Sequence, residues 1–255
     1  MQAQRFELKY IIPDSITLSI RDFVASYLEL DPFAAVGENC SYANHSIYLD
    51  SASLHTYHAG LQGHRNRFKL RVRYYDEKPE TPVFLEIKRR HKDIIQKKRC
   101  AVPRDALLDT LAGYTDFVNP AELEGHAAFC LLMYQIDATP RAHVAYDREA
   151  WVSRIDESVR VTIDRNVRAE PCFDHNLTTT MNNPVFVFGN QDVLELKFTN
   201  RAPDWIRELV RVFHLSQSGG AKYAGGILLM GEHRYAGRRL ASASHADEAT
   251  QTPFA

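Results

Sequence analysis

The stretch Arg65-Asn-Arg-Phe-Lys-Leu-Arg-Val-Arg-Tyr-Tyr75 decides the fold of this chain. Every second residue from Arg65 to Arg73 is basic, and from Phe68 to Tyr74 the residues between them are apolar or aromatic. Alternate residues of a β-strand point to the same face of its sheet. The stretch therefore predicts a strand with one cationic face and one apolar face. A solvated outer face explains this strand alone equally well, so the neighbouring segments must decide.

Three other segments repeat the alternation, and each places a glutamate two residues before a lysine. They are Phe6–Tyr10, Phe84–Lys88 and Val193–Phe198. Residues 65–104 contain fourteen Lys or Arg and five acids, a local charge of +9 in a chain of net charge −1. Like charges packed together repel, so we expect an anionic partner to neutralise them. If the sheet closes, these faces line one lumen, and a multi-phosphate chain is its natural content.

Elsewhere the chain shows many short alternating segments and few amphipathic ones. Alternation predicts strands at 46–50, 65–75, 83–89, 99–102, 141–147, 151–155, 159–164 and 193–198, beside one at the N-terminus. Amphipathic spacing predicts helices at 13–30, 103–113, 121–135 and 203–215. Many strands with few crossover helices favour an antiparallel sheet or barrel. We predict an α+β, mainly β domain over residues 1–236 and a disordered Ala-, Ser- and Thr-rich tail over 237–255.

Composition narrows the class of protein further. A chain of 255 residues with 45% hydrophobic residues fits one globular domain. No run approaches 18 apolar residues, and the N-terminus lacks the apolar centre of a secretory signal. Four scattered cysteines show neither metal nor disulfide spacing. We therefore expect a cytoplasmic protein without a membrane span, and the sequence gives no indication of its oligomeric state.

The glutamates among the cations indicate a metal. A carboxylate repels phosphate unless a divalent cation lies between them, and Mg²⁺ or Mn²⁺ is typically held by one or two carboxylates and phosphate oxygens. Arginine supplies bidentate contacts to phosphate and lysine supplies point charges. No P-loop and no G-x-G-x-x-G motif occurs, so the predicted phosphate site is of another kind. The residue types point to phosphoryl transfer, in which positioning and charge neutralisation provide most of the catalysis.

The ordered set of these segments resembles the VTC domain of the triphosphate tunnel metalloenzyme superfamily. The matching segments are Glu7–Tyr10, Ile47–Ser51, Lys69–Tyr75, Phe84–Lys88, Lys97–Arg99, Tyr146–Arg148, Arg160–Asp164, Leu194–Phe198 and Lys222–Tyr223. Each is weak alone, but nine in the family's order form a specific signal. The resemblance implies an eight-stranded antiparallel β-barrel, the triphosphate tunnel, with flanking helices.

The resemblance also implies roles for individual residues. The catalytic set would be Arg71, Arg73, Lys88, Arg148, Arg160 and Lys197. Lys9, Lys97, Tyr146 and Lys222 would bind the substrate, Tyr146 near the nucleotide. Either Lys97 or Lys98 fits the family's basic strand here, and shared parity with Arg99 favours Lys97. Glu195 would hold Mn²⁺ or Mg²⁺, while the roles of Glu7 and Glu86 stay open. Two residues depart from the family pattern: Ala221 replaces a serine and Arg90 replaces a histidine.

The leading functional hypothesis from this resemblance is an ATP-dependent polyphosphate polymerase, a transferase. A hydrolase of tripolyphosphate or nucleoside triphosphates and a non-catalytic polyphosphate-binding module are the alternatives. The E-x-K of Glu7 and Lys9, in place of the E-x-E-x-K of the triphosphatase branch, favours the polymerase. We do not expect nucleic acid as a partner, because Phe68, Tyr74 and Phe84 are predicted on the face opposite the cations.

Overall fold

The computed structural model describes residues 5–92, 94–113, 120–154 and 158–236. Its long strands are β1 (Arg5–Pro13), β3 (Tyr42–Asp50), β4 (Asn66–Tyr74), β5 (Val83–His91), β6 (Ile94–Val102), β7 (Thr139–Val152), β8 (Val159–Pro171) and β10 (Gln191–Thr199). They form one antiparallel sheet in the order β1-β10-β8-β7-β3-β4-β5-β6. Two short strands, β2 (Glu29–Leu30) and β9 (Val185–Phe186), extend it beside β7 and β8.

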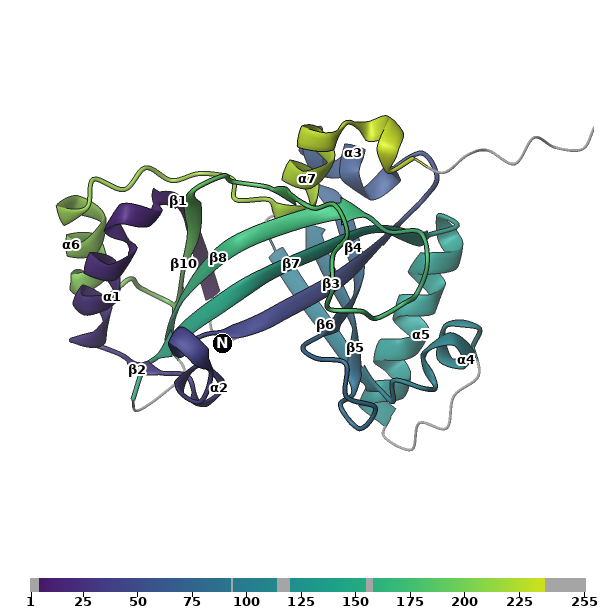
Figure 1. Cartoon of the computed structure of the whole chain (residues 1–255), viewed down its shortest axis with the longest axis horizontal. Coiled ribbons are helices and arrows are strands. Elements are labelled where there is room, and N and C mark those ends of the chain that lie inside the picture. Colours follow the sequence, from purple (N-terminus) through teal and green to yellow (C-terminus); the bar gives the residue numbers. More distant parts are fainter. Residues whose placement is uncertain (1–4, 93, 114–119, 155–157, 237–255) are drawn as a thin grey trace, which may run out of the picture.

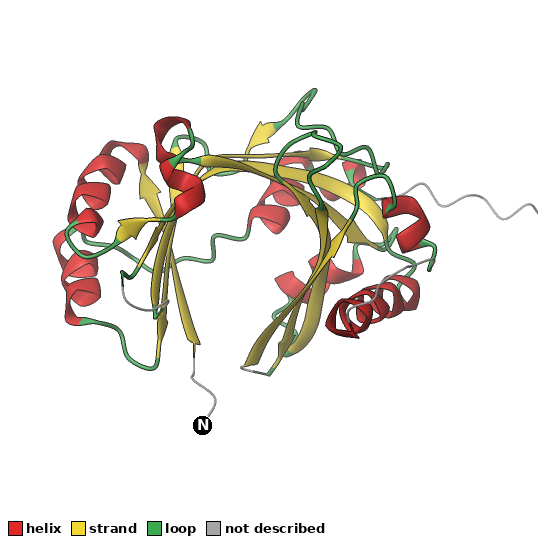
Figure 2. Cartoon of the chain, turned by 90° about the horizontal axis from the view of Figure 1, so that it is seen from below, coloured by secondary structure: helices red, strands yellow, loops and turns green. Residues whose placement is uncertain are grey.

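The sheet curls into an arch whose two edges, β1 and β6, do not pair within the described residues (Figure 2). The antiparallel, mainly β fold is confirmed, but the predicted closed barrel is not. Lys97, Lys98 and Arg99 follow one another along β6, and charged residues on an edge strand disfavour pairing with another strand. An ion pair reaches across the opening instead, with Lys88 Nζ on β5 at 3.5 Å from Glu7 Oε1 on β1.

Helices cover the outside of the arch and one of its ends (Figure 1). They are α1 (Thr17–Ala25), α2 (Pro32–Ala35), α3 (His55–Leu61), α4 (Leu107–Leu111), α5 (Pro120–Gln135), α6 (Asp204–Val212) and α7 (Lys222–Met230), with 3₁₀ turns at Asp14–Ile16, Glu38–Cys40 and Glu232–Arg234. The α1–α6 pair packs an apolar core against β1, β10 and β8, while α4 and α5 pack another against β4, β5 and β6. Ile206 and Leu209 of α6 are buried in the first core, as their spacing predicts.

The third core lies at the upper end of the arch in Figure 1, where α3 and α7 meet the sheet. Tyr223 of α7 stacks on Tyr48 of β3 with ring centroids 4.7 Å apart. The Tyr223 hydroxyl donates a 2.8 Å hydrogen bond to Asp50 Oδ2, which also accepts from Thr56 in α3. These contacts fix α7 across one end of the arch, so that Lys222 at its first position enters the concave side.

Several element boundaries differ from the sequence prediction. The segments predicted as strands at 141–147 and 151–155 form one continuous strand, β7, up to Val152, and Ile155 lies outside the described residues. The helix predicted over 13–30 is a 3₁₀ turn followed by α1 alone. Sequence periodicity missed α3 and α7, which are short and apolar on more than one face. The predicted tail, 237–255, lies outside the described residues.

Within the described part of the chain, we find no helix that is long and apolar enough to cross a membrane.

Candidate functional site

The concave face of the arch carries the charged side chains that the strand alternation predicts. Register confirms their shared face, since Lys9 pairs with Glu195, Lys197 with Arg160, and Arg71 with Glu86. Cations outnumber carboxylates on this face. The cations are Lys9, Lys69, Arg71, Arg73, Lys88, Lys97, Arg99, Arg148, Arg160, Lys197 and Lys222, and the carboxylates are Glu7, Asp31, Glu86, Asp164 and Glu195.

One group of charges surrounds Glu195, whose side chain is almost fully buried. Lys9 Nζ lies 2.7 Å from Glu195 Oε1, and Lys197 Nζ lies 2.8 Å from Oε2. Lys222 Nζ and Arg148 Nη2 approach the same carboxylate at 3.7 and 4.0 Å. We call Glu195 and these four cations the Glu195 cluster. It gathers five of the predicted site residues from β1, β7, β10 and α7.

Electrostatics keep this carboxylate ionised. Burial by itself raises the pKa of Glu195, but the surrounding cations, led by Lys197 and Lys222, lower that pKa well below its ordinary value. The reverse holds for Lys9: burial lowers its pKa, but Glu195 and Glu7 raise it above the ordinary lysine value. An ionised carboxylate among protonated amines can exchange its partners when an anion or a metal arrives.

Asp164 contacts two cations of the Glu195 cluster, Arg148 and Lys222. Its fully buried carboxylate accepts a bidentate contact from Arg148, with Nε to Oδ1 at 2.6 Å and Nη2 to Oδ2 at 2.8 Å. Lys222 Nζ lies 2.6 Å from the same Oδ2. Asp164 lies inside β8 and not at its end. It orients two of the predicted phosphate ligands.

The second group of charges surrounds Glu86, which is also buried. Arg71 Nε donates to Glu86 Oε2 at 2.7 Å, and Arg73 Nε lies 3.9 Å from that oxygen. Lys97 Nζ and Arg99 Nε lie 2.8 and 3.7 Å from Oε1. These residues form the Glu86 cluster. The contact favours Lys97 as the member of the Lys97–Lys98 pair on the concave face, because Lys98 instead pairs with Glu124.

One cation of the Glu86 cluster, Lys97, has a lowered pKa. Burial raises the pKa of Glu86, but Arg71 and Arg73 lower it far below its ordinary value. Burial lowers the pKa of Lys97 to about 8, although Glu86 opposes the shift. Lys97 therefore loses part of its charge near neutral to mildly alkaline pH, whereas the arginines do not.

Tyr146 joins the two clusters. Its hydroxyl accepts a 2.8 Å hydrogen bond from Arg73 Nη2, and Lys222 Nζ and the Arg148 guanidinium lie 4.8 and 5.2 Å from its ring centroid. The pairing of β7 with β8 shifts register at this residue, a distortion that is common near functional sites. Tyr146 therefore connects a cation of the Glu86 cluster to two cations of the Glu195 cluster.

Two predicted residues lie at the periphery. Lys88 contacts neither central carboxylate, but its 3.5 Å contact with Glu7 connects it to Lys9, which lies 3.0 Å from the same oxygen. Arg160 Nη2 donates to Asp31 Oδ2 at 2.8 Å, at the end of the arch beside α2. The structure thus brings most of the predicted residues into two clusters and leaves Lys88 and Arg160 outside them.

Several buried polar atoms on this face have no hydrogen-bond partner among the described residues. They are Asn44 Nδ2 and Ser46 Oγ on β3, Arg73 Nε on β4 and Thr162 Oγ1 on β8. All four lie on strand positions that share the face of the two clusters. A buried polar atom without a partner is costly, so a set of them indicates a polar ligand or bound water.

The sequence departures from the family have visible consequences. Ala221 is the residue that precedes α7, and the helix receives no side-chain hydrogen bond at this end. A serine there would supply a hydroxyl oxygen for such a cap. Arg90 donates its Nε to the Lys92 carbonyl at 2.8 Å, near the tip of the β5–β6 hairpin.

One prediction about the aromatic residues is wrong. Phe84 pairs with Arg73 in register and lies on the cationic face, two residues before Glu86. Phe68 and Tyr74 do lie on the opposite face, since they alternate with Lys69, Arg71 and Arg73 along β4. The sequence alone could have shown the position of Phe84, because Phe84 and Glu86 are two residues apart in one strand and therefore share a face.

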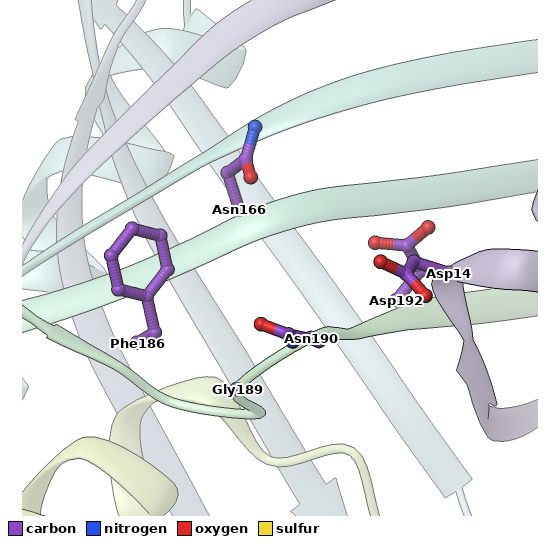
Figure 3. Close-up of a pocket in the computed structure, with 6 residues that line it drawn as sticks. All are labelled: Asp14, Asn166, Phe186, Gly189, Asn190 and Asp192. Carbon is purple, nitrogen blue, oxygen red and sulfur yellow. The ribbon is translucent and has the colours of Figure 1, made fainter.

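A separate cavity of about 290 Å³ lies beside the start of β10 (Figure 3). It is lined by Asp14, Asn166, Phe186, Gly189, Asn190 and Asp192. Asp192 lies three positions from Glu195 on the same strand and hence on the opposite face. Among the described residues, two carboxylates and no Lys or Arg line this cavity, so it does not suit a phosphate.

An open antiparallel sheet with a surplus of cations around buried carboxylates has the charge and shape suited to a polyanion. The chain belongs to the VTC domain family, whose model matches residues 4–230. The resemblance read from the sequence is confirmed, and the family supports an enzyme that binds polyphosphate or triphosphate. No curated protein matches the chain.

Solved structures show weaker similarity. A Bacillus halodurans protein provisionally described as an adenylate cyclase has 10% identity and a TM-score of 0.46, with 87% of this chain and 96% of that chain covered. The PH1819 protein of Pyrococcus horikoshii has 12% identity and a TM-score of 0.42, with 88% and 99% covered. With TM-scores below 0.5, these similarities establish neither fold nor activity.

Proposed function

We propose that this protein transfers the γ-phosphate of ATP onto a polyphosphate chain bound along the concave face. The observation that carries the proposal is the pair of cation clusters that Tyr146 joins on one face. A chain of phosphates is a long polyanion that neutralises both clusters at once. The E-x-K pattern of Glu7 and Lys9 supports synthesis over the triphosphatase branch. A cytoplasmic location, where ATP is supplied, stays a prediction.

In the proposed reaction, a terminal oxygen of the acceptor chain attacks the γ-phosphorus of ATP. The bond from the γ-phosphorus to the β–γ bridging oxygen breaks, and ADP leaves with that electron pair. Arg71, Arg73 and Arg148 would orient the phosphates, because a planar guanidinium makes two directed contacts. Lys9, Lys197 and Lys222 would neutralise the charge that develops on the transferred group.

The Glu195 carboxylate fits a divalent metal only together with the substrate. Within the described residues, no group of three or more His, Cys, Asp or Glu side chains could hold a metal by itself. Mg²⁺ or Mn²⁺ commonly takes one or two carboxylates and completes its shell with phosphate oxygens and water. A metal bound there would neutralise phosphate charge and place the phosphate chain against Glu195. Glu195 would then contact the metal in place of Lys9 and Lys197, and these lysines would contact phosphate oxygens instead.

The test is ³¹P NMR of the purified full chain with ATP and Mn²⁺ or Mg²⁺, with and without a short polyphosphate primer. Growth of the signal from internal phosphates, with ADP as the other product, supports the polymerase. A melting temperature that rises with the logarithm of tripolyphosphate concentration would support binding independently of turnover. Absence of both chain growth and any thermal shift across these metals would reject the proposal.

A hydrolase is the second candidate, and one observation favours it. The sheet is open between β1 and β6 in the described residues, so water can reach phosphates on the concave face from the side. In this reaction water replaces the acceptor chain, and the γ-phosphorus is released as orthophosphate with ADP. The same ³¹P spectra separate the two candidates, because hydrolysis increases orthophosphate without an internal-phosphate signal.

A further inference from the structure

Four aromatic side chains form a continuous row at the end of the arch opposite α7. Phe33 of α2 contacts Tyr42 at the start of β3, with ring centroids 6.4 Å apart. Tyr42 contacts Tyr75 at 6.2 Å, and Tyr75 contacts Phe84 at the start of β5 at 6.0 Å. All three contacts are edge-to-face, so neighbouring rings do not cover one another's faces. We call these four residues the aromatic row, and the proposed phosphoryl transfer gives it no role.

One end of the aromatic row is connected to the Glu86 cluster. The Arg99 guanidinium lies 3.5 Å from the centroid of the Phe84 ring, and its Nη2 donates to the Tyr75 hydroxyl at 3.2 Å. The same arginine reaches Glu86 at 3.7 Å. An arginine that touches both an aromatic ring and the phosphate-facing cluster can serve a ligand that has a flat ring and a phosphate.

The other end is connected to cations of the opposite wall. Tyr42 pairs in register with Arg148, a member of the Glu195 cluster. Asp31 accepts a hydrogen bond from the Phe33 backbone at 2.9 Å and another from Arg160 at 2.8 Å. The aromatic row therefore crosses the end of the arch between two cationic walls.

The aromatic row is not part of an apolar core. Phe33 is 73% exposed, and Tyr42, Tyr75 and Phe84 are only partly buried. None of the four is a member of the three apolar cores. Two positions along β3 from Tyr42, the buried Asn44 amide nitrogen has no hydrogen-bond partner in the part of the chain that the structure describes. Half-exposed rings next to an unpartnered donor suit a ligand that stacks and accepts a hydrogen bond.

We infer that the aromatic row binds the base of a nucleoside triphosphate whose phosphates lie on the cation clusters, an inference that rests on the proposed function. Stacking on an aromatic ring contributes to binding for every base, because each base has a π-face. The row offers few groups that could read a base edge, so it distinguishes nucleoside triphosphates from inorganic tripolyphosphate more than one base from another.

The experiment is isothermal titration of the full chain with ATP and with tripolyphosphate, in metal-free buffer to prevent turnover. Phe33→Leu and Tyr75→Leu should each weaken ATP binding on the order of tenfold, because each removes one stacking surface. Both variants should leave tripolyphosphate binding within about twofold, since they change no charge. Tyr75→Phe, which keeps the ring, should retain most of the ATP affinity. Phe186→Leu is the matched control, an exposed phenylalanine on β9 away from this face.

The outcomes separate this inference from the function on which it rests. Equal loss of ATP and tripolyphosphate affinity, or no loss of either, overturns the base site while leaving the phosphate site in place. An equal effect of Phe186→Leu, or equally tight binding of a short single-stranded oligonucleotide without a triphosphate, overturns it as well. If wild-type protein binds neither ATP nor tripolyphosphate, the proposed function and the base site are rejected together.

Discussion

The Glu195 and Glu86 clusters share one face and one design, a buried glutamate among cations, but the cations differ. Three of the four cations at Glu195 are lysines, whereas three of the four at Glu86 are arginines. A lysine is a compact charge on a flexible stem, and an arginine is a rigid fork that holds its partner in a set geometry. We therefore expect the Glu195 carboxylate to be released to a metal more easily, and Glu86 chiefly to hold arginines in place.

The largest expected effect, and the strongest test of this difference, is Glu195→Gln. The change keeps the side-chain shape and removes the charge that a metal requires. We expect metal-dependent turnover of ATP to fall on the order of 100-fold or more, while tripolyphosphate binding in metal-free buffer is retained. Glu124→Gln, on the surface beside Lys98, is the control for a lost carboxylate charge. Unchanged turnover in Glu195→Gln would remove the metal role from this residue.

A smaller effect is expected from Arg148→Lys. The lysine keeps the charge but cannot make the bidentate contact that satisfies buried Asp164. We expect the free energy of unfolding to fall by about 1–3 kcal/mol, and tripolyphosphate binding to weaken about tenfold. Urea denaturation and calorimetry measure the two effects. Arg154→Lys, in an exposed ion pair with Glu29, should change stability by less than about 1 kcal/mol. Equal effects of the two substitutions would show that the bidentate contact of Arg148 with Asp164 does not stabilise the fold more than an exposed ion pair does.

Glu86→Gln tests the other half of the comparison. If Glu86 positions arginines and does not bind the metal, its amide should retain part of that function, and turnover should fall only about tenfold or less. Metal-free affinity for tripolyphosphate should rise slightly, because a negative charge leaves the face. Turnover assays and calorimetry of Glu86→Gln and Glu195→Gln, run in parallel, show which substitution has the larger effect. A larger loss at Glu86 than at Glu195 would reverse the assignment of the two glutamates.

The smallest expected effect is a pH dependence from Lys97. Its pKa of about 8 means that the free protein loses this positive charge as pH rises through about 8. Protonated Lys97 attracts phosphate and neutral Lys97 does not, so tripolyphosphate affinity should fall over that range, by about threefold. Lys97→Arg should remove most of this loss, because arginine stays charged.

A second group titrates in the same range and serves as the internal check. Burial raises the pKa of Tyr48, but Arg71 and its neighbouring cations lower it to about 8. Loss of its proton adds a negative charge and also weakens binding. A pH dependence that persists in Lys97→Arg and disappears in Tyr48→Phe would assign the effect to the tyrosine and contradict the Lys97 prediction.

Sequence reasoning found most members of both clusters, and its failures have physical causes. Strand parity placed Arg71, Arg73 and Lys97 on one face because side-chain direction in a strand has a period of two. It left the role of Glu86 open, because parity does not show which cations reach a given carboxylate. It gave Asp164 no role in the site, because the partners of this buried carboxylate, Arg148 and Lys222, come from another strand and from a helix. The role of each residue in phosphate or metal binding stays a prediction.

What the sequence determined by itself was the alternation: which face of each strand is charged, and that glutamates lie among the cations. The tertiary structure decided the rest. It left the sheet open, separated the charges into a lysine-rich and an arginine-rich cluster, and brought Lys222 into the site by packing α7 through Tyr223. It also assembled the aromatic row from α2, β3, β5 and the residue after β4. Such groupings depend on strand order and helix docking, which are set by long-range packing rather than by any local pattern.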